Sequence, residues 1–191
     1  MHAICIDIDN VIARTDEVMR EVIRECSKSN VDLAYEDVVC FDYWKCRDSA
    51  GRRFHKTEWK IIHEEFTRNH LLRIQPFDNI KENLERISQR FQVHLATSRL
   101  PEGEEKTLAW LKQHQIPHFQ LHPVVHGRKH LIEHPFVAAI EDDREQAYAF
   151  SAKGVPVFLL AHPWNEIGPF SQLKRVASWK DMTNQILSLS V

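Results

Sequence analysis

Residues 3–9 read Ala-Ile-Cys-Ile-Asp-Ile-Asp, a short apolar run that ends in carboxylates. An apolar run of this length is typical of a strand that is buried on both faces of a parallel sheet. We therefore predict a strand over residues 3–8, with Asp7 and Asp9 at its carboxyl end. Ligands bind outside the carboxyl ends of the strands in an open parallel sheet, so we expect the chemistry to lie there.

The chain after Pro76 has the rhythm of an α/β protein, in which short apolar runs alternate with segments of helical periodicity. Asp78 is the expected cap of a helix whose apolar face carries Ile80, Leu84 and Ile87. Gly154 can close a later helix as a left-handed residue. The pattern predicts strands over 91–96, 119–125, 136–140 and 155–161, and helices over 104–114, 144–153 and 171–189.

Between the first strand and Pro76 lies a long segment that mixes aromatic and charged side chains and shows no strand alternation. Apolar residues recur at helical spacing over 16–28, where Asp16 is the expected cap, and again over 56–72. We predict a helical cap over 15–75, inserted into a core of 1–14 and 76–191. The predicted fold class is α/β, a three-layer, Rossmann-like parallel sheet with an inserted α-helical cap.

The composition excludes several classes of protein. The 191 residues include 25 basic and 27 acidic side chains, so no broad positive field would attract a nucleic-acid polymer. No apolar run approaches the roughly 18 to 20 residues that cross a bilayer, and the N-terminus does not resemble a signal peptide, so we expect a cytoplasmic protein without membrane contact. The four cysteines form no CxxC pair, which favours free thiols over disulfides or a zinc cage.

Polar side chains follow three of the predicted strands, at the point where each strand ends. They are Asp7 and Asp9, then Thr97 and Ser98, then Glu141, Asp142 and Asp143. Because the carboxyl ends of parallel strands share one edge of the sheet, we expect these groups to converge on one crevice. Clustered carboxylates repel one another unless a cation neutralises them, and hard oxygen ligands suit Mg²⁺. The pattern therefore predicts a magnesium site.

Magnesium in turn suggests a phosphate ligand. Hydroxyls and backbone N–H groups at Thr97 and Ser98 could hold phosphoryl oxygens. A lysine could neutralise the remaining charge, and Lys129, which lies between two predicted core strands, is the best-placed candidate. The neighbouring Arg128 could serve instead.

Taken in order, these groups resemble the four motifs of haloacid dehalogenase superfamily phosphatases: Asp7-Ile-Asp9-Asn-Val, His-Leu-Ala-Thr97-Ser98, Lys129 and Ala-Ile-Glu141-Asp142-Asp143. The helical segment after the first motif resembles the cap that this superfamily inserts there. Further segments resemble the 5'(3')-deoxyribonucleotidase branch and its bacterial nucleotidase relatives: Tyr-Glu-Asp37-Val, Phe-Asp-Tyr43-Trp44, Thr97-Ser98-Arg99 and His162-Pro-Trp164-Asn165.

The resemblance implies a role for individual residues. Asp7 would be the nucleophile that takes up the phosphoryl group, and Asp9 would protonate the leaving alcohol and then activate water. The Asp7 carboxylate, the Asp9 backbone carbonyl and a carboxylate of the third acidic group would hold Mg²⁺. Asp142 is favoured as that third ligand, because it is selected whether the acids are counted from the strand end or back from Arg144. Asn10 departs from the glycine that is common at its position.

The implied function is a Mg²⁺-dependent phosphomonoesterase that acts on a small molecule, in the first place a nucleoside monophosphate. One alternative is a phosphatase for another small metabolite such as a sugar phosphate, because the cap selects the rest of the substrate. A second alternative is a phosphate-binding module without turnover, against which the intact acids argue. The sequence leaves open whether the protein forms a homo-oligomer.

Two further features have competing interpretations. Phe41, Tyr43 and Trp44 could stack on a nucleobase when the insertion closes over the core, or form the insertion's own small core, which we favour for any single residue. Six histidines recur at every fourth residue over 114–134, but three prolines among them exclude a continuous helix. A local pair such as His126 and His130 could still contribute to a zinc site, although no third ligand is evident.

Overall fold

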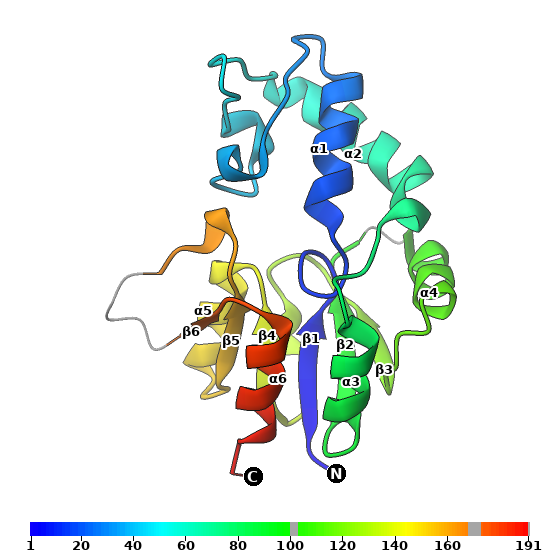
Figure 1. The fold of residues 1–191 in the computed structure, drawn as a ribbon, viewed down its shortest axis with the longest axis vertical. Helices are drawn as coiled ribbons and strands as arrows, with labels where there is room; N and C mark the ends of the chain where they lie inside the picture. The colour runs from blue at the N-terminus through cyan, green and yellow to red at the C-terminus, as the bar shows by residue number, and fades with distance from the viewer. Residues whose placement is uncertain (100–102, 168–172, 191) are drawn as a thin grey trace.

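A computed structural model describes residues 1–99, 103–167 and 173–190. All six strands assigned within these residues pair in parallel, in the order β3-β2-β1-β4-β5-β6 (Figure 1). The strands are β1 (Ala3–Asp7), β2 (Gln92–Thr97), β3 (Gln120–Pro123), β4 (Phe136–Glu141), β5 (Val157–Leu160) and β6 (Lys174–Val176). The order reverses between β1 and β4, and such a reversal creates the crevice in which open α/β sheets bind ligands. The predicted α/β, Rossmann-like class is confirmed.

The α-helices of the described residues are α1 (Thr15–Cys26), α2 (Lys56–Asn69), α3 (Ile80–Ser88), α4 (Glu104–Gln113), α5 (Arg144–Ala152) and α6 (Trp179–Leu187). Of these, α3, α5 and α6 pack on the sheet. Successive side chains of β1 point to opposite faces. Ile4 and Ile6 join the apolar cluster of α3 and α6, which pack on each other, whereas Ala3 and Cys5 join a second cluster with α5. β1 is therefore buried along its whole length, as its apolar sequence predicts.

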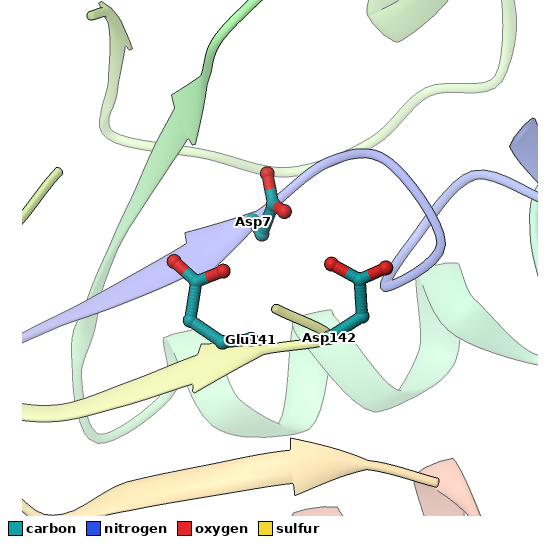
Figure 2. A group of neighbouring side chains, drawn as sticks. All are labelled: Asp7, Glu141 and Asp142. Atoms are coloured by element: carbon teal, nitrogen blue, oxygen red, sulfur yellow. The ribbon is translucent and has the colours of Figure 1, made fainter. Parts of the chain in front are cut away.

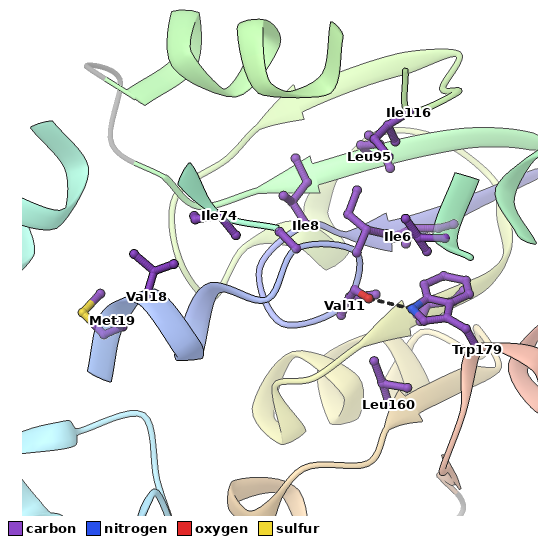
Figure 3. Packing of buried hydrophobic residues seen from close by; sticks show 14 of the residues in the cluster. Ile6, Ile8, Val11, Val18, Met19, Ile74, Leu95, Ile116, Leu160 and Trp179 are labelled. Carbon is purple, nitrogen blue, oxygen red and sulfur yellow. Dashed lines mark hydrogen bonds between the residues drawn. The ribbon is translucent and has the colours of Figure 1, made fainter. Parts of the chain in front are cut away.

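The loop after β1 is hydrogen-bonded to α6, the C-terminal helix. The indole N–H of Trp179 donates to the carbonyl of Val11 at 2.7 Å (Figure 3). Between β1 and Val11, Asn10 has a φ of 56°, a left-handed conformation that asparagine tolerates better than most residues. Its Oδ1 also accepts a hydrogen bond from the backbone N–H of Asp16 at 2.7 Å. Asn10 therefore adopts the left-handed backbone conformation that a glycine would adopt at this position.

The inserted segment lies beyond the end of the sheet at which β1 ends, where α1 and α2 pack on each other (Figure 1). The described residues between α1 and α2 contain only short 3₁₀ turns, Tyr35–Asp37 and Tyr43–Lys45, so the helical character of the segment agrees with the sequence pattern. The chain enters and leaves the inserted segment side by side: Ala13 and Pro76 form an isolated antiparallel bridge, and the N–H of Arg14 donates to the carbonyl of Gln75 at 2.9 Å. The division into a core and a cap at these boundaries stays a prediction.

Three local predictions were wrong. The segment predicted as a helix over 171–189 contains β6 and then α6, and its first two residues lie outside the described residues. β6 is only three residues long and two of them are exposed, so it shows no readable alternation. Neither Asp16 nor Asp78 caps a helix: Arg14 and Asn79 hold those positions, and neither makes a side-chain cap. Instead, Asp78 pairs with Arg14 at 2.6 Å.

Candidate active site

Three carboxylates meet where the strand order reverses. Asp7 ends β1, Glu141 ends the neighbouring β4, and Asp142 follows directly (Figure 2). One carboxylate oxygen from each lies within 4.8 Å of one from both others, and all three residues are buried. This is the one group of three or more potential metal ligands within the part of the chain that the structure describes. Of the acids predicted to converge, the structure thus brings Asp7, Glu141 and Asp142 together.

Lys129 supplies a positive charge to this cluster. Its Nζ lies 2.7 Å from Oδ2 of Asp7 and 3.1 Å from Oε2 of Glu141, and the residue is only 4% exposed. Burial alone would lower the pKa of Lys129, but the charges of Asp7 and Glu141 outweigh burial and hold that pKa above its ordinary value. Arg128 is exposed, so the structure brings the lysine and not the arginine to the acids.

The three consecutive acids at the carboxyl end of β4 have three different surroundings. Glu141 accepts from Lys129, whereas Asp143 accepts from the backbone N–H of Glu145 at 2.8 Å and caps α5. Asp142 faces Asp7, and Glu141 rather than Asp143 is the second acid of this group. The role of Asp142 as a metal ligand stays a prediction. The Asp142 carboxylate also accepts a hydrogen bond from Trp164, whose indole N–H donates to Oδ2 at 3.2 Å.

The donor set fits a divalent cation. Burial raises the pKa of Asp142 well above its ordinary value, and the neighbouring charge of Asp7 raises it further. Burial likewise raises the pKa of Glu141, whose Oε1 finds no hydrogen-bond partner among the described residues. Three buried carboxylates therefore face the single ammonium of Lys129. Oxygen ligands with such an excess of negative charge are those that hard cations such as Mg²⁺ prefer.

Asp9 stands apart from this cluster. Its carboxylate accepts from the Thr15 hydroxyl at 2.5 Å and from Nη2 of Arg99 at 2.7 Å, while Nε of Arg99 lies 3.1 Å from both oxygens. Burial would raise the pKa of Asp9, but the Arg99 charge outweighs it and holds the pKa below its ordinary value. In this arrangement Asp9 is an ionised, paired carboxylate.

The structure adds Arg99 to the site, a residue to which the sequence assigned no role. It also donates to the Thr107 hydroxyl through Nη1 at 3.1 Å, so the guanidinium bridges α4 and the loop after β1. Its only signal in the sequence is its place directly after Thr97-Ser98. Nothing in the local sequence specifies its partner, because Asp9 lies 90 positions away.

Thr97 and Ser98 lie at the carboxyl end of β2, beside β1. Thr97 is 2% exposed, and its hydroxyl accepts from the backbone N–H of Arg99 at 3.2 Å. The Ser98 hydroxyl is buried without a hydrogen-bond partner in the described residues, and Ser98 lines a cavity over the carboxylates. An unpartnered buried hydroxyl is costly, so Ser98 is suited to bind an oxygen of a ligand.

A cavity of about 670 Å³ lies between the carboxylate cluster and the inserted segment. Asp7, Asp9, Lys129 and Asp142 form its floor, and aromatic side chains of the insertion line its wall, namely Phe41, Tyr43, Trp44, Trp59 and Phe66. This volume is within the range of about 300 to 1,000 Å³ that small-molecule sites occupy.

The structure distinguishes the roles of these aromatic residues. Tyr43 is 6% exposed, stacks on Trp59 at a centroid distance of 5.5 Å, and donates its hydroxyl to Asp16 at 2.9 Å. It therefore belongs to the insertion's own core. Phe41 is 37% exposed and packs on Trp164 of the core at 5.7 Å, so it lies at the mouth between the two parts.

The repeated histidines form no metal site within the described residues. His122 and His134 instead pack around the ring of His94, with centroid distances to His94 of 5.2 and 4.3 Å. His126 lines the cavity, with its Nε2 at 4.0 Å from Asp143. The structure gives no support to the pairing of His126 with His130.

A parallel sheet of this order, with acids at the ends of β1 and β4, is the fold of solved haloacid dehalogenase family hydrolases. A family model described as "5' nucleotidase, deoxy (Pyrimidine), cytosolic type C protein" matches residues 1–190. The chain therefore belongs to that family and is a phosphatase. None of the curated proteins matches it. No helix among the described residues is long and apolar enough to span a bilayer.

Solved structures with low sequence identity share the fold. Protein tyrosine kinase A of Mycobacterium tuberculosis is 11% identical, with a TM-score of 0.71 and 97% of each chain covered. A haloacid dehalogenase family hydrolase from Deinococcus radiodurans, solved with phosphate and sodium, is 12% identical, with a TM-score of 0.63 and 95% of this chain and 93% of that one covered. CbbY from Rhodobacter sphaeroides, solved with xylulose-(1,5)bisphosphate, is 14% identical, with a TM-score of 0.58 and 94% and 95% covered.

Proposed function

We propose that this protein is a Mg²⁺-dependent phosphomonoesterase that hydrolyses nucleoside monophosphates through an aspartyl-phosphate. The observation that carries the proposal is the position of Asp7, which faces Asp142 and Lys129 on the floor of a ligand-sized cavity. Its Oδ1 accepts from the backbone N–H of Ile8 at 2.7 Å and its Oδ2 contacts Lys129, so the carboxylate is oriented from both sides. Such an orientation suits a nucleophile that must attack phosphorus in line.

The Asp7 carboxylate, the Asp9 carbonyl and the Asp142 carboxylate are the groups that would hold the metal. Bound Mg²⁺ would offset the repulsion between an anionic nucleophile and an anionic phosphate. Ser98 and Lys129 would bind phosphoryl oxygens, Ser98 through its unpartnered hydroxyl. These groups stabilise the charge that develops on the transferring phosphoryl group.

Asp9 would donate a proton to the leaving oxygen and then take one from the attacking water. Its ion pair with Arg99 favours the charged form, which suits the second step. For the first step Asp9 must carry a proton, so the Arg99 guanidinium has to turn from Asp9 towards the substrate. An anionic substrate provides the competing charge that such a turn needs.

The family description and the aromatic wall of the cavity support a nucleotide as the substrate. Aromatic rings such as Phe41 offer flat apolar area to a base. The structural neighbour solved with a sugar bisphosphate supports the alternative, a sugar phosphate.

Phosphate release from ribo- and deoxyribonucleoside, sugar and amino-acid monophosphates, measured with Mg²⁺ and with excess chelator, tests the proposal. We expect nucleotides to be hydrolysed with the highest kcat/KM and chelation to stop turnover. Asp7→Asn is the matched control, because it keeps the shape of the side chain and removes the nucleophile. Preference for a sugar phosphate would overturn the nucleotide assignment, and full activity in chelator would overturn the metal.

A further inference from the structure

Two cysteines of the insertion, which flank a segment that lines the cavity, lie close to each other. Sγ of Cys40 lies 3.9 Å from Sγ of Cys46, and both thiols are free. Cys46 is 2% exposed, and its thiol points back to the carbonyl of Cys40 at 3.7 Å. Cys40 is half-buried and lies 3.6 Å from the carbonyl of Asp42. A disulfide needs about 2.05 Å between the sulfurs, so a shift of roughly 2 Å would join them.

The short loop between these thiols carries side chains that line the cavity. Phe41, Tyr43 and Trp44 all lie within it. Phe41, directly after Cys40, packs on Trp164, and Trp164 donates to Asp142 of the carboxylate cluster. Tyr43 donates to Asp16, which is buried in the first turn of α1. Movement of the two sulfurs towards each other would therefore displace the wall of the site.

We propose that Cys40 and Cys46 form a reversible disulfide when they react with a hydroperoxide, and that this bond lowers the kcat/KM of phosphomonoester hydrolysis at the adjacent site. The second half of the proposal rests on the proposed phosphomonoesterase function. Formation of the disulfide does not depend on that function. Neither of the other two cysteines forms a contact with this pair: Cys5 is buried in β1, and Cys26 is exposed at the end of α1.

The chemistry balances with hydrogen peroxide as the oxidant. Cys40, the more accessible thiol, loses a proton, and its thiolate attacks one peroxide oxygen. The O–O bond breaks, Cys40 becomes a sulfenic acid, and the departing hydroxide takes up the proton to give water. The Cys46 thiol then attacks the sulfenic sulfur, so an S–S bond forms, the S–O bond breaks, and a second water leaves. Two thiols are oxidised and one peroxide is reduced.

The surroundings of the pair fit this order of events. Burial raises the pKa of Cys46 to about 11, so it remains a protonated thiol that peroxide does not reach. Cys40 is the thiol with access to solvent. A partly exposed thiol beside a resolving cysteine is the arrangement typical of reversible redox pairs.

The test uses the full-length chain with Cys26→Ser, which removes the exposed thiol. After treatment with hydrogen peroxide, the intact mass should fall by two hydrogen atoms. Lys45 lies between the two cysteines, so trypsin should release residues 29–45 joined to the dipeptide 46–47. Dithiothreitol should separate the two peptides. Peroxide that oxidises Cys26 in the unsubstituted chain but leaves residues 29–45 and 46–47 unlinked would overturn the proposal.

Activity is measured on the same samples. We expect kcat/KM for the best substrate to fall by about tenfold on oxidation and to recover with dithiothreitol, because displacements of about 1 Å at positioning groups cost up to about 100-fold. In Cys40→Ser, peroxide should leave kcat/KM unchanged and form no link; Cys46→Ser should likewise form no link. A complete link with unchanged kcat/KM would overturn the regulatory half. If the reduced protein hydrolyses none of the phosphomonoesters, the proposed function fails, while the mass measurement still decides the disulfide.

Discussion

The environment of single side chains determines which acid can do which task. Asp7 and Asp9 are two positions apart, yet one lies beside Lys129 among buried carboxylates and the other is paired with Arg99. Asp142 is held by groups that follow β5, since Trp164 donates to its carboxylate and Asn165 donates to its carbonyl at 2.9 Å. The sequence motifs indicate the identities of these acids. They do not indicate the partners, because each partner comes from a distant part of the chain.

The role of Asp9 can be separated from that of Asp7 by the leaving group. Asp9→Ala should lower kcat for a nucleotide by about 10² to 10⁴-fold, because an alkoxide must be protonated as it departs. The loss should be much smaller for formation of the phosphoenzyme from p-nitrophenyl phosphate, whose leaving group needs no proton. Single-turnover release of the alcohol or phenol measures both. An equal loss with the two substrates would contradict the assignment of Asp9 as the acid.

Lys129 contributes to stability as well as to the site. Lys129→Met should destabilise the fold by about 3 to 5 kcal/mol, because it leaves Asp7 and Glu141 buried together without a cation. Urea denaturation in chelator measures the free energy of unfolding. Arg128→Met is the matched control and should change it by less than about 0.5 kcal/mol, since surface substitutions have small effects. Comparable effects of the two substitutions would refute this account of Lys129.

At the scale of secondary structure elements, the start of α5 is where a structural acid and a functional acid are adjacent. Asp143 caps α5, whereas Asp142 faces the cluster. Asp143→Ala should therefore lower the stability by about 1 kcal/mol, as loss of a cap does, and retain Mg²⁺-dependent turnover. Asp143→Asn should restore most of the stability, because asparagine also caps well.

The companion variant is Asp142→Asn, which keeps the fold but removes a carboxylate from the cluster. We expect the Mg²⁺ concentration required for half-maximal turnover to rise steeply. The increase in melting temperature that Mg²⁺ produces in the unsubstituted protein should also disappear, because a ligand stabilises the state that it binds. If Asp143→Asn weakened the metal response more than Asp142→Asn, the assignment of the two acids would have to be exchanged.

The predictability of an element from sequence depends on its length and its burial. β1 and β4 could be predicted because buried strands of the central sheet carry continuous apolar runs. β6 could not, since an edge strand of three residues with two exposed basic side chains has no periodicity to detect. Helix starts were misassigned because the type of a residue does not show which tertiary partner it binds. Asp78 has the composition of a cap, but a tertiary ion pair with Arg14 engages it instead.

On the scale of the whole molecule, one histidine, His162 in the loop after β5, contacts both the insertion and the loop after β1. Nε2 of His162 lies 2.7 Å from the carbonyl of Asn10, so this nitrogen carries the proton and donates. Nδ1 then accepts from the Tyr35 hydroxyl at 2.8 Å, and the ring stacks on Trp164 at 4.3 Å. The sequence places His162 beside Trp164 but gives no indication of Tyr35, which lies 127 positions away. Both hydrogen bonds are made by the neutral ring.

This arrangement predicts an acid-sensitive fold. Burial lowers the pKa of His162 from 6.5 to about 4. The unfolded chain binds a proton at His162 below about pH 6.5 and the folded chain does not, so this contribution to stability is complete above that pH and is lost as the pH falls towards 4. At pH 5 the loss from this one group is about 2 kcal/mol.

His162→Gln isolates this contribution, because the glutamine amide can donate to Asn10 and accept from Tyr35 without titrating. The free energy of unfolding from urea denaturation, measured at several values between pH 7 and pH 5, should fall more steeply for the unsubstituted protein than for His162→Gln. All other titrating groups are common to both chains, so the difference between the two slopes belongs to His162. Parallel slopes would show that this ring is already free to take up a proton in the fold, and that the contact between the insertion and the core does not depend on its neutral form.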